Sequence, residues 1–236
     1  MTGLPRPAVC TLLFLALCTG GAQGQPSSCS SDGEPQPAGL LERFINADCE
    51  ACWSDARTRR PGARDVALDW IVPGSAGEAA PLAAAASRDA LARLKTLGRP
   101  APPRTAASRR EVQRTQRKLR VAHGLAFNGY IGTSIELEPG SGGPWKAWLL
   151  LVETIPAGTE GTPVTRNLVR NALQTAWNEP GPLSKEEQKR LFESRPMSIP
   201  DGAQAARLRV VGWVEDARGQ IRAIAQSRCV PPGSKG

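Results

Sequence analysis

Two cysteines separated by two residues follow directly on an apolar segment with strand character. Residues 40–55 read LLERFINADCEACWSD, and Cys49 and Cys52 lie where the apolar run gives way to a segment of helical character. Three residues along a helix is close to one turn, so both sulfurs lie on one face and can join with little backbone movement. The spacing therefore predicts a disulfide or a reactive dithiol at the start of a short helix.

If the pair is reactive, Cys49 is the expected attacking sulfur, since the amide groups and dipole of a helix N-terminus favour a thiolate. Cys49 is also expected to be the more exposed of the two. Asp48 and Glu50 flank it and disfavour the thiolate, which predicts a sluggish or reducing pair. A purely structural disulfide stays open as an alternative. A zinc site is less favoured, because it needs about four ligands and the other cysteines and the single histidine are distant in sequence.

The N-terminal residues have the pattern of an export signal. Arg6 precedes an uncharged run over residues 8–17, and Ala22-Gln23-Gly24 places small residues where a signal peptidase reads them. The run is shorter than the roughly 20 residues that span a bilayer. Residues 1–24 are thus predicted to be a cleaved signal peptide of a periplasmic or secreted protein, followed by a flexible leader over residues 25–39.

Cleavage at that point removes two of the six cysteines, Cys10 and Cys18, and leaves an even number. An even count in an exported protein indicates pairing. Once Cys49 and Cys52 pair with each other, Cys29 and Cys229 remain, and an intramolecular bridge between them is predicted. The alternatives are that each is free or bonded to another molecule.

The first part of the chain alternates strand and helix patterns. Strands are predicted over residues 40–45 and 66–72, the second reading VALDWIV, with a short helix between them that ends at Pro61-Gly62. A longer helix is predicted over residues 78–97, because its apolar residues recur at helical spacing and Gly98 follows. This βαβα order predicts an α/β fold over residues 40–104.

Residues 104–120 hold most of the excess positive charge. They contain seven basic residues against Glu111, a net charge of +6. One interpretation is weak contact with an anionic envelope surface through Arg110, Arg114 and Arg117. The other is a solvated face of a helix. Aromatic residues do not interleave the arginines, so nucleic-acid binding is not predicted.

A hairpin is predicted over residues 119–137, with Asn128-Gly129 at its turn. To keep the apolar residues on one face, we expect a three-residue loop, 127–129. That register pairs Leu125 with Ile131 and Val121 with Ile135, and it places His123 beside Thr133. His123 could serve as a catalytic base, but it is expected to be a packed strand residue.

The remaining segments complete a region, residues 105–236, that is predicted to be a basic helix followed by a β-rich part. A strand is expected over residues 145–155. Thr162 and Pro163 predict the start of a helix that continues to residue 176. A second, short helix is expected over residues 184–192, and the chain ends in two strands over residues 207–215 and 220–229.

Five stretches resemble a family of exported bacterial thioredoxin-like proteins of unassigned role, the domain-of-unknown-function family numbered twelve twenty-three. They read LLERFINADCEACWSDA, VALDWIV, WLLLVETIP with TRNLVRNAL, and RVVGWVEDARGQIRAIA. The resemblance implies a thioredoxin-like N-terminal half whose redox centre is Cys49 and Cys52. Members usually have a Thr-Pro-Gln stretch that lines the substrate groove, and this chain lacks it.

Two functions are therefore expected as alternatives. The first is thiol–disulfide exchange with a protein partner, in which Cys49 attacks and Cys52 resolves the mixed disulfide. The second is a non-catalytic thioredoxin-like binding or structural module of the cell envelope. No cofactor and no bound metal are predicted, and the sequence does not indicate an oligomeric state.

Overall fold

Strands dominate the folded chain, which is a mostly β structure of two sheets with two α-helices. The computed structural model describes residues 29–113, 115–138, 142–178 and 191–229. The predicted signal peptide, the first four residues of the predicted leader (25–28), Arg114 and most of the predicted helix at 184–192 lie outside these residues. In the described residues, no helix is long and apolar enough to cross a bilayer.

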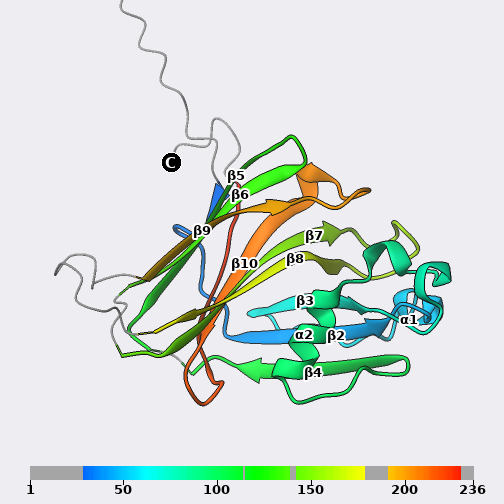
Figure 1. Ribbon diagram of the computed structural model, residues 1–236, viewed down its shortest axis with the longest axis horizontal. Coiled ribbons are helices and arrows are strands. Elements are labelled where there is room, and N and C mark those ends of the chain that lie inside the picture. The colour runs from blue at the N-terminus through cyan, green and yellow to red at the C-terminus, as the bar shows by residue number, and fades with distance from the viewer. Residues whose placement is uncertain (1–28, 114, 139–141, 179–190, 230–236) are drawn as a thin grey trace, which may run out of the picture.

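The larger sheet has seven strands in the order β11-β10-β7-β8-β3-β2-β4 (Figure 1). Strand β3 runs parallel to both β2 and β8, and all other neighbours are antiparallel. The strands are β2 (Gly39–Asn46), β3 (Asp65–Val72), β4 (Thr105–Glu111), β7 (Trp145–Ile155), β8 (Arg166–Trp177), β10 (Leu208–Glu215) and β11 (Ile221–Gln226). A backbone hydrogen bond of 2.8 Å from Gln113 to the carbonyl of Ile221 brings the two edges of this curled sheet together.

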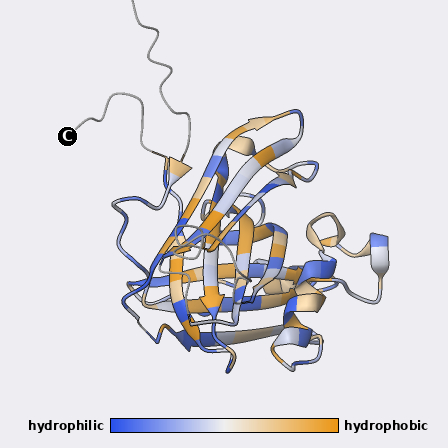
Figure 2. Cartoon of the chain, turned by 60° about the vertical axis from the view of Figure 1, so that its left-hand side comes forward, coloured by the Kyte–Doolittle hydropathy of each residue, from blue (hydrophilic) through white to orange (hydrophobic). Residues whose placement is uncertain are grey.

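The smaller sheet packs against one face of β7, β10 and β11. Its strands, in the order β1-β5-β6-β9, are β1 (Cys29–Ser30), β5 (Lys118–Phe127), β6 (Tyr130–Glu138) and β9 (Leu191–Ser198). Apolar and polar residues are interspersed along the strands, as Figure 2 shows, and in β6 they alternate, so that one side of the smaller sheet can be buried. The sheets approach each other closely at Gly212, where a Cβ would lie 2.7 Å from Val121 and 2.8 Å from Ile135.

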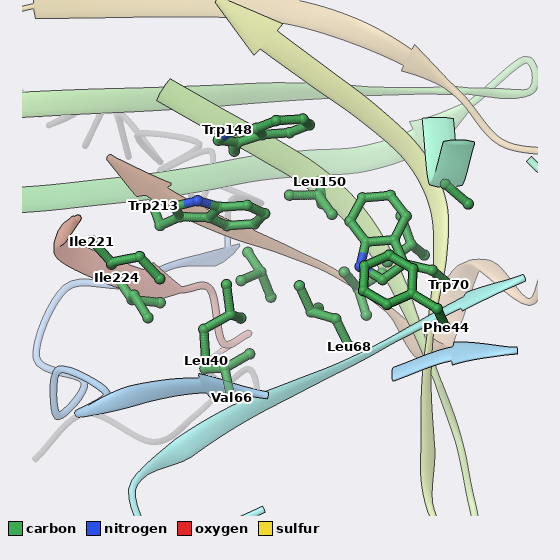
Figure 3. Packing of buried hydrophobic residues seen from close by; sticks show 14 of the residues in the cluster. Leu40, Phe44, Val66, Leu68, Trp70, Trp148, Leu150, Trp213, Ile221 and Ile224 are labelled. Atoms are coloured by element: carbon green, nitrogen blue, oxygen red, sulfur yellow. The ribbon is translucent and has the colours of Figure 1, made fainter. Parts of the chain in front are cut away.

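The opposite face of the larger sheet forms a second core, covered by α2 (Arg88–Thr96). In Figure 3, side chains from five strands point toward one another there, and the rings of Trp148 and Trp213 stack with centroids 5.5 Å apart. Ser87 caps α2 by accepting a hydrogen bond from the amide of Asp89. Burial of each large apolar side chain in this core contributes about 1.5–3 kcal/mol.

Arg93 of α2 reaches into that core and is fully buried. Its guanidinium donates hydrogen bonds of 2.8 Å to Glu42 and 3.2 Å to Glu215, and its Cζ lies 4.6 Å from the ring centroid of Trp148. Burial raises the pKa of Glu215, but the charge of Arg93 and a hydrogen bond from Trp213 outweigh this and lower the pKa below its usual value. The ion cluster therefore fixes α2 to β2 and β10, which lie near opposite edges of the sheet.

The predicted α/β class and its thioredoxin-like βαβα start are wrong. The helix after the dithiol, α1 (Glu50–Trp53), is one turn long, and residues 54–64 return to the start of β3 without further helix. The helix predicted over residues 78–97 is only α2, preceded by two 3-10 turns at Gly77–Ala79 and Ala83–Ala85. A second helical layer over the sheet therefore does not form.

Two predicted helices in the second half are strands. The basic segment forms β4 and the start of β5, and β4 pairs with β2. The segment predicted as a helix from Thr162 to residue 176 forms β8, which contains a β-bulge opposite Leu151 and Val152. Arg170 is the extra residue of that bulge. The extra residue shifts the in-and-out alternation of the side chains in β8 by one position. The buried residues of β8 therefore have a spacing in the sequence that resembles the spacing in a helix.

The β5–β6 hairpin has the predicted alignment over most of its length but a different turn. Val121 pairs with Ile135 and His123 with Thr133, as predicted. The loop contains only Asn128 and Gly129, with φ of 47° and 75°, the conformation of a two-residue type I′ turn. A bulge between His123 and Ala126 restores the phase instead, so the predicted pairing of Leu125 with Ile131 is wrong. The predicted strands around 145–155, 207–215 and 220–229 are confirmed as β7, β10 and β11.

Candidate functional site

Cys49 and Cys52 form a disulfide at the carboxyl end of β2, with Cys49 as the N-cap residue of α1. Their Cα atoms lie 5.3 Å apart. Both residues are buried, with 8% of Cys49 and 4% of Cys52 exposed, among Ile45, Ile71 and Ala80. The predicted pairing is confirmed. The prediction that Cys49 is exposed at the start of the helix is wrong, because Cys49 is buried.

The backbone of the dithiol turn is held from both sides. Arg166 of β8 donates hydrogen bonds of 3.2 Å to the carbonyl of Cys52 and 2.6 Å to that of Trp53. These are carbonyls that a helix end leaves without partners. The indole of Trp53 donates a bond of 2.7 Å to the carbonyl of Glu160. The turn is therefore anchored on the β7–β8 connection as well as on its own strand.

Asp48, next to Cys49, interacts mainly with the loop after β3. Its carboxylate accepts hydrogen bonds of 2.8 Å and 2.9 Å from the amide and hydroxyl of Ser75. Desolvation raises the pKa of Asp48, but the bonds from Ser75 outweigh it and lower the pKa below its usual value. Asp48 thus joins the two loops at the carboxyl ends of β2 and β3.

A buried charged cluster lies under the segment that connects α1 to β3. Asp69 of β3 pairs with Arg43 of β2 at 2.5 Å and with Arg166 of β8 at 3.2 Å, and Asp69 and Arg166 have no exposed side-chain surface. One carboxylate therefore serves two guanidinium groups. Burial, together with the nearby charge of Arg43, lowers the pKa of Arg166 despite Asp69. The Nε of Arg43 is buried and has no hydrogen-bond partner among the described residues.

A groove of about 460 Å³ opens over this cluster, between the α1–β3 and β7–β8 connections. Arg43 and Ala67 contribute from the sheet, and Arg60 contributes a further guanidinium at the surface. The complete lining is Arg43, Thr58, Arg60, Pro61, Ala67, Ala157, Pro163, Val164, Thr165 and Asn167. Its charged groups are all cationic, and its other polar side chains are hydroxyls and one amide.

A second, smaller cavity of about 260 Å³ lies against Trp53. Trp53, Ile71 and Leu168 form part of its apolar wall, while Arg170 and Glu160 contribute charge. Arg170 is itself paired with buried Glu153 at 2.6 Å. Trp53 lines this cavity but not the cationic groove, and the Cζ of Arg166 lies 5.2 Å from its ring centroid.

The second predicted disulfide is present, between Cys29 of β1 and Cys229 beyond β11. Cys29 is buried, whereas Cys229 is exposed. His123 pairs with Cys29 across β1 and β5, is 5% exposed, and is the packed strand residue that the sequence predicted. Burial lowers the pKa of His123, partly offset by a hydrogen bond of 2.9 Å between its Nδ1 and the carbonyl of Gly124.

The basic residues proposed for anionic surface contact have partners in the fold. Arg110 donates hydrogen bonds to Glu42 and Glu215, and the Cζ of Arg117 lies 4.7 Å from the ring centroid of Trp145. Arg114 lies outside the described residues. Contact of this segment with an anionic surface stays a prediction, although Arg110 is committed to an internal ion cluster.

The Arg43–Asp69–Arg166 cluster was not predicted from the sequence. A signal was present in LLERFIN and VALDWIV, where isolated charged residues interrupt strands that are otherwise apolar. A charge on a buried strand needs a partner, so such residues indicate an internal ion cluster. Arg166 could not be assigned to it, because its segment was predicted to be a helix.

Comparison of the chain with protein-family models gave no match, and comparisons with curated proteins and with solved structures gave none either. The resemblance to the domain-of-unknown-function family therefore stays a prediction. The function has to be argued from the chemistry of the chain's own residues.

Proposed function

We propose that this protein is an exported, non-catalytic module that binds a small anionic ligand in the groove over Arg43, Asp69 and Arg166. The observation that carries the proposal is that Asp69 alone pairs with two buried guanidinium groups. The charge of Asp55 also acts on Arg166, but Asp55 pairs with Arg57, and Arg60 adds a further positive charge at the rim of the groove.

A buried cation without a full counter-charge is costly, and a bound anion lowers that cost. Arginine is suited to this role, because its planar fork of donors matches the oxygens of a carboxylate, sulfate or phosphate. Thr58 and Thr165 line the same groove and supply hydroxyl donors. A small oxyanion, or the acidic group of a larger molecule, fits this donor set.

Thiol–disulfide exchange through Cys49 and Cys52 is the alternative. Exchange requires an attacking thiolate to reach a sulfur, and the low exposure of both residues opposes this. In our proposal their disulfide is structural. It closes the turn whose carbonyls face Arg166, and it thereby fixes the chain that forms one wall of the groove.

Export is part of the proposal. It is supported by the uncharged run over residues 8–17 with its small residues before Gln25, and by two disulfides, which persist in oxidising compartments. A soluble anion or an acidic envelope polymer would then be available to the groove.

Calorimetric titration of the mature protein with sulfate, phosphate, acetate and citrate in low-chloride buffer tests the proposal. We expect saturable binding with one site per chain, weakened about tenfold in Arg60→Gln, since a charged hydrogen bond contributes about 1.5–3 kcal/mol. Arg57→Gln is the matched control, because Arg57 lies on the same connection, is 91% exposed, and does not line the groove. Equal weakening in both variants, or no saturable binding, would show that the groove is not a specific anion site.

The double variant Cys49→Ser/Cys52→Ser should still bind the anion, because the disulfide is not a ligand in our proposal. Rapid thiol–disulfide exchange between the wild type and a dithiol substrate would favour the alternative function.

A further inference from the structure

We propose that reduction of the Cys29–Cys229 disulfide opens a metal site in which the two thiolates and His123 bind a thiophilic ion such as Zn²⁺. The two sulfurs and a ring nitrogen of His123 lie within 4.8 Å of one another. This site is separate from the groove, and the inference does not depend on the proposed function.

Three segments that are distant in sequence bring the ligands together. Cys29 lies directly opposite His123 in the β1–β5 pair. An antiparallel β-bridge between Ser30 and Arg228 places the next residue, Cys229, beside Cys29. Zn²⁺ binds sulfur at about 2.3 Å and nitrogen at about 2.0–2.1 Å, so two ligands of one ion lie roughly 3.3–3.8 Å apart. The observed separations are compatible with that range once the sulfurs part. Cys229 is exposed beyond the last strand, so its side chain can turn without disturbing the core.

The hydrogen bonding of His123 is that of a metal ligand. A carbonyl oxygen can only accept, so the 2.9 Å contact with Gly124 requires the proton on Nδ1 and leaves a free lone pair on Nε2. That Nε2 is buried and has no hydrogen-bond partner among the described residues, in a side chain that is 95% buried. An unsatisfied buried polar atom is costly, and a bound ion would satisfy it. Metal-ligating histidines commonly donate their other N–H to a backbone carbonyl, as His123 does.

The opening step is a thiol–disulfide exchange with an external dithiol. A thiolate of the dithiol attacks the sulfur of Cys229, the more exposed residue of the pair, the Cys29–Cys229 bond breaks, and Cys29 leaves as a thiolate beside His123. The second thiol of the donor then displaces Cys229, so the donor ends as a disulfide. Two electrons and two protons have passed to Cys29 and Cys229.

Metal binding then exchanges protons for the ion. Zn²⁺ replaces the protons of both thiols and takes the lone pair of Nε2, and two protons are released to water. Three protein ligands leave a fourth coordination position for water or for a ligand from a partner. Oxidation by a disulfide-forming partner reverses both steps and releases the ion. A metal is thus bound only in the reduced form.

The test is a titration of the reduced, reductant-free mature protein with Co²⁺, followed by displacement with Zn²⁺. All variants carry Cys49→Ser and Cys52→Ser, which leaves Cys29 and Cys229 as their only cysteines once the signal peptide is removed. We expect one ion per chain, with the near-ultraviolet absorption of thiolate–Co²⁺ bonds. The oxidised protein should not bind. His123→Ala should weaken binding by about 100-fold or more, since loss of even an outer partner of a ligating histidine costs about 10–100-fold.

Two further measurements distinguish a lost ligand from a lost fold. Near-ultraviolet circular dichroism of oxidised His123→Ala reports whether the sandwich is intact. In addition, Zn²⁺ should slow iodoacetamide labelling of Cys29 and Cys229 in the reduced parent protein. If intact His123→Ala binds Co²⁺ as tightly as its parent, or if Zn²⁺ does not protect the two cysteines, the proposed site is wrong. Cys229→Ser, which removes an exposed ligand, should weaken binding as His123→Ala does, and unchanged affinity there would also contradict the proposal.

Discussion

Arg166 Nη2 lies 2.6 Å from the carbonyl oxygen of Trp53, which makes a fully buried guanidinium the C-terminal cap of the dithiol turn. The same side chain donates from Nη1 to Asp69 at 3.2 Å and to Thr58 at 3.1 Å. Arg166 therefore joins the turn, the following connection and the middle of the sheet. Its position explains why one carboxylate is shared between two arginines, because the second arginine also satisfies backbone carbonyls.

Removing Asp69 should destabilise the fold more than removing Arg166. In Asp69→Asn, two buried guanidinium groups lose their counter-charge, and we expect a loss of about 4–5 kcal/mol. In Arg166→Met, the carbonyls of Cys52 and Trp53 lose a donor, but Asp69 keeps Arg43, so a loss of about 3 kcal/mol is expected. Urea unfolding of the oxidised proteins measures both. Arg57→Ala, at an exposed site, should change stability by less than about 0.5 kcal/mol, and the reverse order of the two core variants would contradict the charge balance described here.

The two disulfides should differ in their rate of reduction in the native protein. Cys229 is exposed, whereas Cys49 and Cys52 are both buried, so an external dithiol should open the Cys29–Cys229 bond first. Timed quenching with iodoacetamide and peptide mapping gives the order. In unfolded protein the difference should disappear, which serves as the control. Faster opening of the Cys49–Cys52 bond would instead favour the exchange function.

Loss of the long-range disulfide should lower stability substantially. Cys29 and Cys229 are 200 residues apart in sequence, and the chain-entropy relation gives about 5 kcal/mol as an upper value for a loop of that length. The double variant Cys29→Ala/Cys229→Ala should therefore have a lower urea midpoint and a steeper urea dependence, because the unfolded chain without the cross-link exposes more surface. The Cys49–Cys52 disulfide joins residues only three apart in sequence, so Cys49→Ala/Cys52→Ala should lower stability less.

Asp65 should contribute to stability in a pH-dependent way. Hydrogen bonds from Arg109 at 2.8 and 3.1 Å are the largest cause that lowers the pKa of Asp65 below its usual value of 3.8. A carboxyl with a lowered pKa in the folded state stabilises the fold above its unfolded pKa, and this is lost as pH falls through the folded value. The free-energy difference between wild type and Asp65→Asn should be constant from about pH 5 upward and shrink below about pH 4. A difference that does not change with pH would mean that the charge of Asp65 is not responsible.

Local sequence patterns predicted the strands in which the spacing of the apolar residues shows that the segment is a strand. VALDWIV and WKAWLLLVETI are buried on both faces and form β3 and β7 as expected. β8 was missed because the bulge at Arg170 changes the phase of its apolar residues, and the partner strands that stabilise a bulge are not visible locally. The basic segment was missed for a related reason. Arg109 and Arg110 have acidic partners from β2, β3 and β10, and their positions depend on the tertiary fold.

Candidate site residues divide in the same way. Both disulfides followed from cysteine spacing and count, since few pairings are possible. The positions of His123 beside Cys29 and of Arg166 beneath the dithiol turn depend on strand pairings between distant segments. The contacts that carry the proposed chemistry could therefore not be predicted, because they join residues that are far apart in the sequence.

The bond between Cys29 and Cys229 also decides how the protein responds to mechanical load. Because these residues lie side by side and are covalently joined, tension between the two ends of the polypeptide passes through one S–S bond. The two sheets between them are shielded from that tension. In a stretching experiment the sandwich should stay folded in the oxidised protein, and its rupture should be seen only after reduction.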